Sequence, residues 1–148
     1  MNLANNKDSE VVLSKGDILF QEGEVVEFVY VLKRGLLLSV TKSGERIVPI
    51  FSVKDQGVLG EDCAFKGDKY FYSSIAMESS VLVKIPKQDI TKFLNSSSDW
   101  LNKVLLDMSE KLNSTKTIIS EHRIFSDKLM SGIDFTNELE AQIRKKLN

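Results

Sequence analysis

Short strand-like segments, each closed by a glycine-containing turn, fill the first half of the chain. They cover residues 10–13, 17–20, 27–32, 36–41 and 45–51. Strands that recur at about eight to twelve residues with turn signals between them predict an antiparallel sandwich or barrel. Pro49 lies inside the fifth segment, and because proline cannot donate a ladder hydrogen bond, it predicts an edge strand or a bend there.

Helical periodicity replaces this pattern after Pro86. Residues 80–85 still alternate like a strand, and Pro86 suits the first turn of a helix over 87–94. A polar loop follows, in which Ser98 or Asp99 is a suitable N-cap for a long helix that runs to about Phe125. A short charged helix is expected over 136–147.

The long helix carries a heptad-like row of side chains at spacings of four and three. The row consists of Leu101, Leu105, Met108, Leu112, Thr115, Ile119 and His122. It can pack on the chain's own barrel or on a second copy of the chain. Because the row is longer than one small barrel can cover, we favour a homodimer.

Composition excludes several classes of protein. The chain has 148 residues, 42% of them hydrophobic, and a net charge of −1, which argues for one domain and against a dedicated nucleic-acid binder. It shows no signal peptide and no apolar run long enough to span a bilayer. Cys63 is the only cysteine, which fits a reducing cytoplasm. With His122 as the only histidine, a metal-dependent barrel enzyme is not expected.

The segment 57–76 combines residue types that suit a sugar phosphate. Gly57 and Gly60 permit close backbone approach, and Glu61 can accept hydrogen bonds from hydroxyls. A short helix beginning at Glu61 would aim unpaired amides at an anion. The same residues also fit a tight turn between two strands with a solvated glutamate, and the segment alone does not separate the two interpretations.

Three blocks in order resemble the cyclic nucleotide-binding domain family, the regulatory module of catabolite-activator-type proteins, nucleotide-dependent kinases and gated channels. They are the glycine-punctuated residues 16–35, the tripeptide Leu59-Gly60-Glu61, and the helix pair 87–94 and 99–125. The resemblance covers residues 9–125. It implies a mainly β fold with α, an antiparallel β-roll (a jelly-roll-like barrel) followed by C-terminal helices, one of them long.

The expected organisation follows from the resemblance and the patterns together. Residues 1–8 form a flexible N-terminus, and 9–94 form the β-roll with its short helix. Residues 95–125 form the long dimerisation helix, and 126–148 a tail helix. The family's transcription factors carry a further DNA-binding domain, for which residues 126–148 are too few.

The resemblance also implies a set of ligand-binding residues. Glu61 would hydrogen-bond the ribose 2′-hydroxyl, and backbone amides beside Gly60 would hold the cyclic phosphate. The family then places an Arg before two small residues, which Ser73 and Ser74 match. This alignment puts Phe71 at the arginine position, with Tyr72 as the alternative register. The full expected set is Gly60, Glu61, Asp62, Cys63, Ala64, Phe71, Tyr72, Ser73 and Ser74.

Neither aromatic can neutralise a phosphate, whereas an Arg–phosphate contact is charge-assisted and often bidentate. Lys66 and Lys69 could compensate, although solvated loop lysines are the favoured interpretation. The sequence therefore predicts a non-catalytic, cytoplasmic regulatory module without metal or cofactor. It would capture a cyclic nucleotide (cAMP or cGMP, weakly if at all) or another small anionic ligand, and transmit this to the C-terminal helices.

The alternative is a degenerate module of the same fold that binds no nucleotide and serves as a dimerisation or docking scaffold. In both cases we expect a homodimer and an unknown protein partner, with no direct DNA binding and no membrane contact.

Overall fold

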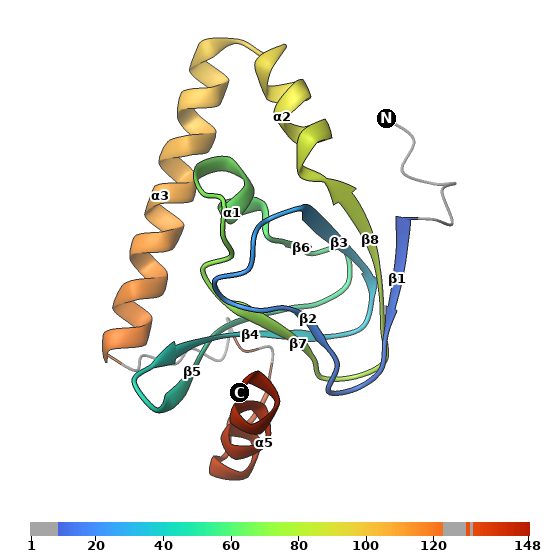
Figure 1. Ribbon diagram of the computed structural model, residues 1–148, viewed down its shortest axis with the longest axis vertical. Coiled ribbons are helices and arrows are strands. Elements are labelled where there is room, and N and C mark those ends of the chain that lie inside the picture. Colours follow the sequence, from blue (N-terminus) through green and yellow to red (C-terminus); the bar gives the residue numbers. More distant parts are fainter. Residues whose placement is uncertain (1–8, 123–129, 131) are drawn as a thin grey trace.

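Two antiparallel sheets of four strands face each other in the computed structural model, which describes residues 9–122, 130 and 132–148 (Figure 1). One sheet has the order β1-β8-β3-β6 and the other β2-β7-β4-β5. The strands are β1 (Glu10–Leu13), β2 (Ile18–Phe20), β3 (Phe28–Arg34), β4 (Leu37–Ser43), β5 (Arg46–Val53), β6 (Val58–Leu59), β7 (Ser73–Ala76) and β8 (Ser80–Pro86). The prediction of a mainly β fold of the β-roll type is confirmed, although the sheets do not close into a barrel.

The main core lies between the two sheets. Leu37 and Tyr72 from one side meet Leu32, Leu59 and Leu82 from the other, and all five side chains are almost completely buried. Burying apolar surface at about 25 cal/mol per Å² is the main driving force for closing the roll. This core places the start of β7 beside the helix that follows β6.

A β-bulge in β5 controls which side chains face the interior. Ser39 of β4 pairs with Phe51, and its neighbour Val40 pairs with Pro49, so Ile50 is skipped in the ladder. Pro49 is tolerated because β5 is an edge strand, as the sequence predicted. The bulge lets the consecutive residues Ile50 and Phe51 both contribute to the main core.

Three helices lie on one side of the roll, and a fourth lies below it (Figure 1). They are α1 (Glu61–Lys66), α2 (Lys87–Asn95), α3 (Asp99–His122) and, below, α5 (Asn137–Leu147). Thr136, the N-cap of α5, accepts a hydrogen bond from the amide of Leu139. Gly60 and Pro86, the N-caps of α1 and α2, make no side-chain cap bond. The predicted segment 1–8 and the predicted helix end at 123–125 lie outside the described residues.

Helix α3 packs along α1. Ser109 is 2% exposed, and its hydroxyl donates a hydrogen bond to the carbonyl oxygen of Asp62. Leu101 and Leu105 are half-buried, whereas Met108 and Leu112 are about half exposed. The predicted row is therefore divided between a face toward the roll and a face toward solvent, and the side chains of its last two members lie outside the described residues.

Helix α5 covers the outer face of the sheet β2-β7-β4-β5, opposite the main core (Figure 1). Ile143 and Leu147 pack against Leu38, Val40 and Ile47 of this sheet. The helix thus closes a second, smaller core. Within the described part of the chain, no helix is both long and apolar enough to cross a membrane.

Candidate functional site

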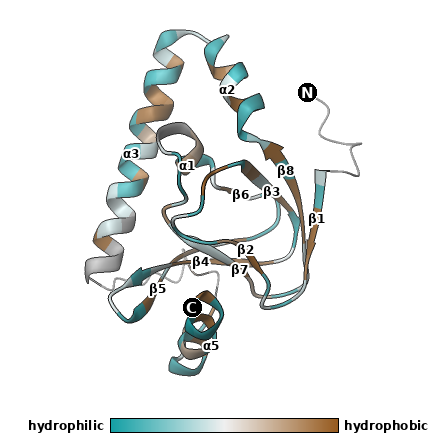
Figure 2. Ribbon diagram, in the orientation of Figure 1, coloured by the Kyte–Doolittle hydropathy of each residue, from teal (hydrophilic) through white to brown (hydrophobic). Residues whose placement is uncertain are grey.

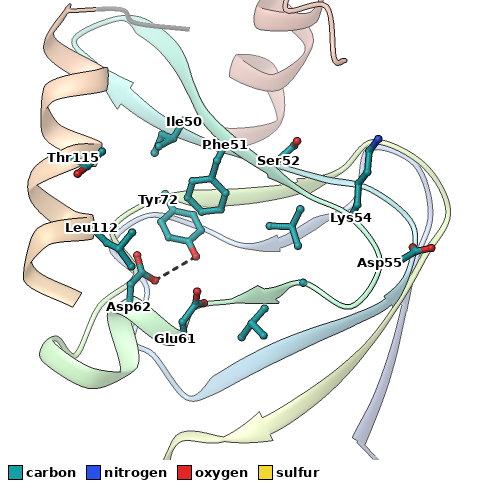
Figure 3. Close-up of a pocket in the computed structure, with 13 residues that line it drawn as sticks. Ile50, Phe51, Ser52, Lys54, Asp55, Glu61, Asp62, Tyr72, Leu112 and Thr115 are labelled. Atoms are coloured by element: carbon teal, nitrogen blue, oxygen red, sulfur yellow. Dashed lines mark hydrogen bonds between the residues drawn. The ribbon is translucent and has the colours of Figure 1, made fainter. Parts of the chain in front are cut away.

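A cavity of about 550 Å³ lies between the roll and α3, and we call it the main cavity (Figure 3). Its lining comes from four places along the chain. Strand β5 supplies Ile50, Phe51, Ser52 and Val53, and the following turn and β6 supply Lys54, Asp55, Gly57 and Val58. The remaining walls are Glu61 and Asp62 of α1, Tyr72 before β7, and Leu112 and Thr115 of α3.

The position of α1 depends on Gly60. Its φ of +84° lies in the left-handed region, and an added Cβ would come within 3.1 Å of the Tyr70 ring. The close approach that glycine permits here is therefore to the protein's own aromatic side chain. The amide of Gly60 donates to the Tyr72 hydroxyl at 3.0 Å, which joins the start of α1 to the start of β7.

Two adjacent carboxyl groups enter the main cavity from α1. One oxygen of Glu61, Oε2, is fully buried and has no hydrogen-bond partner among the described groups. Burial raises the pKa of Glu61 to about 7, and the neighbouring Asp62 adds to the shift. Asp62 is 9% exposed, and burial raises the pKa of its carboxyl as well. This end of the cavity therefore holds two carboxyl groups in a poorly solvated space.

Tyr72, and not Phe71, lines the main cavity. The Tyr72 ring is 1% exposed and lies edge-on to Phe51, and its hydroxyl donates to Asp62 Oδ1 at 3.4 Å (Figure 3). Phe71 is half-buried, and its ring packs close to Gly67. Of the two aromatics that the alignment considered for the arginine position, the structure brings only Tyr72 to the carboxyl groups.

Four other expected site residues lie elsewhere. Cys63 is fully buried in the main core, where its thiol donates to Asp62 Oδ1 and burial raises its pKa. Ala64 lines a separate hollow toward α2 and α3. Ser73 accepts a hydrogen bond from the amide of Glu22, and the buried Ser74 hydroxyl has no hydrogen-bond partner among the described groups.

Sequence reasoning missed the contribution of β5 to the site. Ile50 and Phe51 carry no motif, and they reach the cavity only because of the bulge. Leu112 and Thr115 were placed on the dimer row, yet both also line the cavity. The available signal was their spacing of three residues, because residues three apart are neighbours on one helix face and can line the same surface.

The residue types that line the main cavity indicate what it can bind. Within the described residues, no group of three or more His, Cys, Asp or Glu side chains could hold a metal ion. The cavity combines apolar walls with a few polar groups, including three carboxyl groups, one amine and one phenol, which is the usual composition of a small-molecule site.

Comparison with solved structures gives the same fold. The cAMP-bound EAL enzyme Bd1971 superposes with a TM-score of 0.69 at 19% identity, over 77% of this chain and 30% of that one. The N-terminal domain of a transcriptional regulator from Streptomyces coelicolor superposes with a TM-score of 0.54 at 24% identity, over 85% and 81%. FixK2 from Bradyrhizobium japonicum gives 0.58 at 14%, over 76% and 54%.

The chain thus spans less than a third of the length of the EAL enzyme that it matches. No curated protein matches it in sequence. Residues 10–97 match the sequence profile of the cyclic nucleotide-binding domain, a regulatory module. Since this match covers more than half of the chain and agrees with the β-roll fold, the protein belongs to the cyclic nucleotide-binding domain family.

Proposed function

We propose that the protein is a non-catalytic regulatory module that captures a small molecule in the main cavity and reports its presence through α3. The observation that carries this proposal is the shared lining: Phe51 of β5, Glu61 of α1 and Leu112 of α3 all face the same space. A ligand there contacts the rigid roll and the long helix together.

Asp62 is the physical link between ligand and helix. Its carboxyl lines the main cavity, while its backbone carbonyl accepts the hydrogen bond of Ser109 on α3. A ligand that displaces α1 therefore acts on the α1–α3 contact. Such coupling requires the ligand to prefer one helix arrangement, because only a differential affinity shifts an equilibrium.

The first ligands to test are cyclic nucleotides, which the EAL enzyme Bd1971 binds in its cAMP-bound and cGMP-bound structures. We expect weak or absent binding here. We assign Tyr72, which occupies the arginine position in the alternative alignment register, to the place of the family's arginine. Of the two aromatic residues it is the one that lines the cavity. A phenol cannot neutralise a cyclic phosphate.

Calorimetric titration with cAMP and cGMP tests the assignment through two matched variants. Tyr72→Arg should improve the affinity for cAMP by about tenfold, since a charge-assisted contact is worth about 1.5–3 kcal/mol. Phe71→Arg, which places the same charge one residue away, should leave the affinity for cAMP unchanged. An improvement in Phe71→Arg alone would reverse the assignment.

Hydrogen exchange of α3 tests the coupling. A ligand that occupies the main cavity should change the exchange rates of the amides around Leu112 and Thr115, which line it. If a ligand binds and the exchange rates of these amides do not change, binding in the cavity is not transmitted to α3.

A second candidate function is a scaffold that binds no nucleotide and dimerises through α3. The observation in its favour is the exposed stripe, which we define as Trp100, Val104, Met108 and Ile118. These apolar side chains are 45–67% exposed and recur along α3. The ribbon of α3 alternates between hydrophobic and hydrophilic segments (Figure 2). Exposed apolar surface of this kind commonly marks a protein–protein contact. The stripe borders the cavity-lining residues Leu112 and Thr115 on the same side of α3, so a partner bound there would also be sensitive to occupation of the cavity.

A further inference from the structure

The main cavity presents carboxyl groups where a phosphate ligand needs a cation. Glu61 Oε2 is buried in the cavity wall without a hydrogen-bond partner among the described groups. Asp62 faces the same space and is 9% exposed. The Tyr72 hydroxyl and the Cys63 thiol each donate to Asp62 Oδ1 at 3.4 Å, and backbone hydrogen bonds at Asp62 and Cys63 also reach this carboxyl.

No buried cation balances these carboxyl groups among the described side chains that line the cavity. Lys54 is the only basic residue of that set, and it is exposed. Its amino group points away from Glu61 and Asp62 (Figure 3). Asp55 is already engaged, since its Oδ1 accepts a hydrogen bond from the amide of Gly35 at 2.9 Å. An anion would therefore meet carboxyl oxygens, with no balancing cation among the described lining residues, in a poorly solvated space.

Much of the remaining lining is apolar. It includes Ile50, Phe51, Val53, Val58 and Leu112. Such a surface favours a hydrocarbon or aromatic body. The unsatisfied Glu61 oxygen, by contrast, calls for a hydrogen-bond donor, because an unpaired buried acceptor costs its full desolvation penalty.

We propose that the main cavity selects an organic cation, an apolar body that carries a protonated amine, and discriminates against anions such as cyclic nucleotides. The amine donates to Glu61 Oε2 and interacts with the Asp62 carboxylate, while the body packs on Phe51 and Leu112. This inference rests on the proposed function, since it names the ligand class of the same site.

The selection depends on pH through Glu61. The titratable groups around it are Asp62 and Cys63 on α1, Tyr72 before β7, and Lys54 and Asp55 at the turn after β5. Because burial places the pKa of Glu61 at about 7, its carboxylate forms as pH rises through neutrality. Cation binding then strengthens and anion binding weakens over that window.

Three probes with one skeleton test the proposal by calorimetry: phenylbutylamine, phenylbutanol and phenylbutyrate. At about pH 8 the amine should bind about tenfold more tightly than the alcohol, and the carboxylate should bind most weakly. Amine binding should weaken toward about pH 6 as Glu61 takes up its proton. Equal binding of all three, or tightest binding of the carboxylate, would overturn the proposal.

Matched variants attribute the effect to the cavity. Glu61→Gln should lower the affinity for the amine by about tenfold, remove most of its pH dependence and leave alcohol binding within about twofold. Glu78→Gln, which changes an exposed glutamate at the β7–β8 turn, should behave like the unaltered protein. Equal losses in both variants would assign amine binding to the general surface charge.

The same titrations separate this inference from the proposed function. Absence of amine binding overturns the cation proposal whatever else binds. If cAMP or cGMP then binds and alters exchange in α3, the regulatory function stands with an anionic ligand. If the amine binds at Glu61 but α3 is unaffected, the ligand class stands and the regulatory output does not.

Discussion

Glu61 places a carboxyl group where its charge is poorly solvated, and this affects stability as well as binding. Burial raises its pKa from 4.5 to about 7, so in this window the folded protein holds a proton that the unfolded chain has released. The associated stability is present below about pH 4.5 and is lost as pH rises through 7. Above that pH, the folded state contains a buried carboxylate.

We therefore expect Glu61→Gln to raise the free energy of unfolding by about 1–3 kcal/mol at about pH 8 and to change it little at about pH 4.5. Urea denaturation at the two pH values measures the difference, with Glu78→Gln as the control for loss of one negative charge. A stabilisation of equal size at both pH values would contradict the burial argument.

Tyr72 has a structural role in addition to its place in the cavity. Its hydroxyl accepts from the amide of Gly60 and donates to Asp62. Tyr72→Phe leaves that buried amide without its partner, so the free energy of unfolding should fall by about 1–2 kcal/mol. The urea midpoint measures this loss. An unchanged midpoint would mean that water replaces the hydroxyl at no cost.

At the scale of elements, α5 is held on the sheet by a charged cluster as well as by its apolar face. The carboxyl of Glu140 is 4% exposed and accepts hydrogen bonds from Arg46 Nε at 2.7 Å, from Arg46 Nη2 at 2.9 Å and from the amide of Ile47 at 3.0 Å. Arg144, one turn later on α5, donates to it as well. The hydrogen bond from Arg46 is the main reason that the pKa of Glu140 falls to about 2.

This cluster predicts an acid-sensitive attachment of α5. Because the pKa of Glu140 is depressed from 4.5, the stability it contributes is present above about pH 4.5 and is lost as pH falls toward 2. Thermal unfolding between these values should show a steeper loss of stability in the unaltered protein than in Glu140→Gln. Glu138→Gln, an exposed neighbour on the same helix, is the matched control. Parallel pH profiles for all three proteins would contradict the assignment.

The elements were more accessible to sequence reasoning than the site was. Alternation and turn glycines predicted the strands because those are local signals, and β1 and α2 agree with their predicted bounds within one residue. The strand β6 was not predicted, because two residues are too few to show the alternation of apolar and polar side chains that identifies a strand. The docking of α5 on the sheet was also missed, because its apolar face does not say which surface it covers.

At the scale of the whole molecule, the cavity shows why a motif identified only part of the site. Glu61 and Asp62 followed from the resemblance, as one segment carries them. Phe51 and Leu112 come from segments far apart in the chain, and their meeting depends on a bulge and on how α3 crosses α1. Such contacts are set by packing, which has no short signature in the sequence.

Assembly is the remaining property at this scale, and we propose that a homodimer forms through the exposed stripe of α3. Trp100 is 67% exposed, Met108 54% and Val104 45%, and their spacing of four places all three along one side of α3. Leu105, in contrast, is half-buried beside Ala64 and lines the hollow between the helices. The stripe, and not the whole heptad row, is thus the surface available to a partner copy.

Val104→Asp combined with Met108→Asp should therefore give a folded monomer, because two buried charges without partners are costly in an apolar interface. Sedimentation velocity at high micromolar concentration measures the mass, and circular dichroism confirms that the roll remains folded. Lys103→Asp, at an exposed position on the flank of α3, should remain dimeric, whereas Leu105→Asp should loosen α3 from α1 and lower the melting temperature. A monomeric unaltered protein, or a double variant that stays dimeric, would place the interface elsewhere and leave the stripe to another kind of partner.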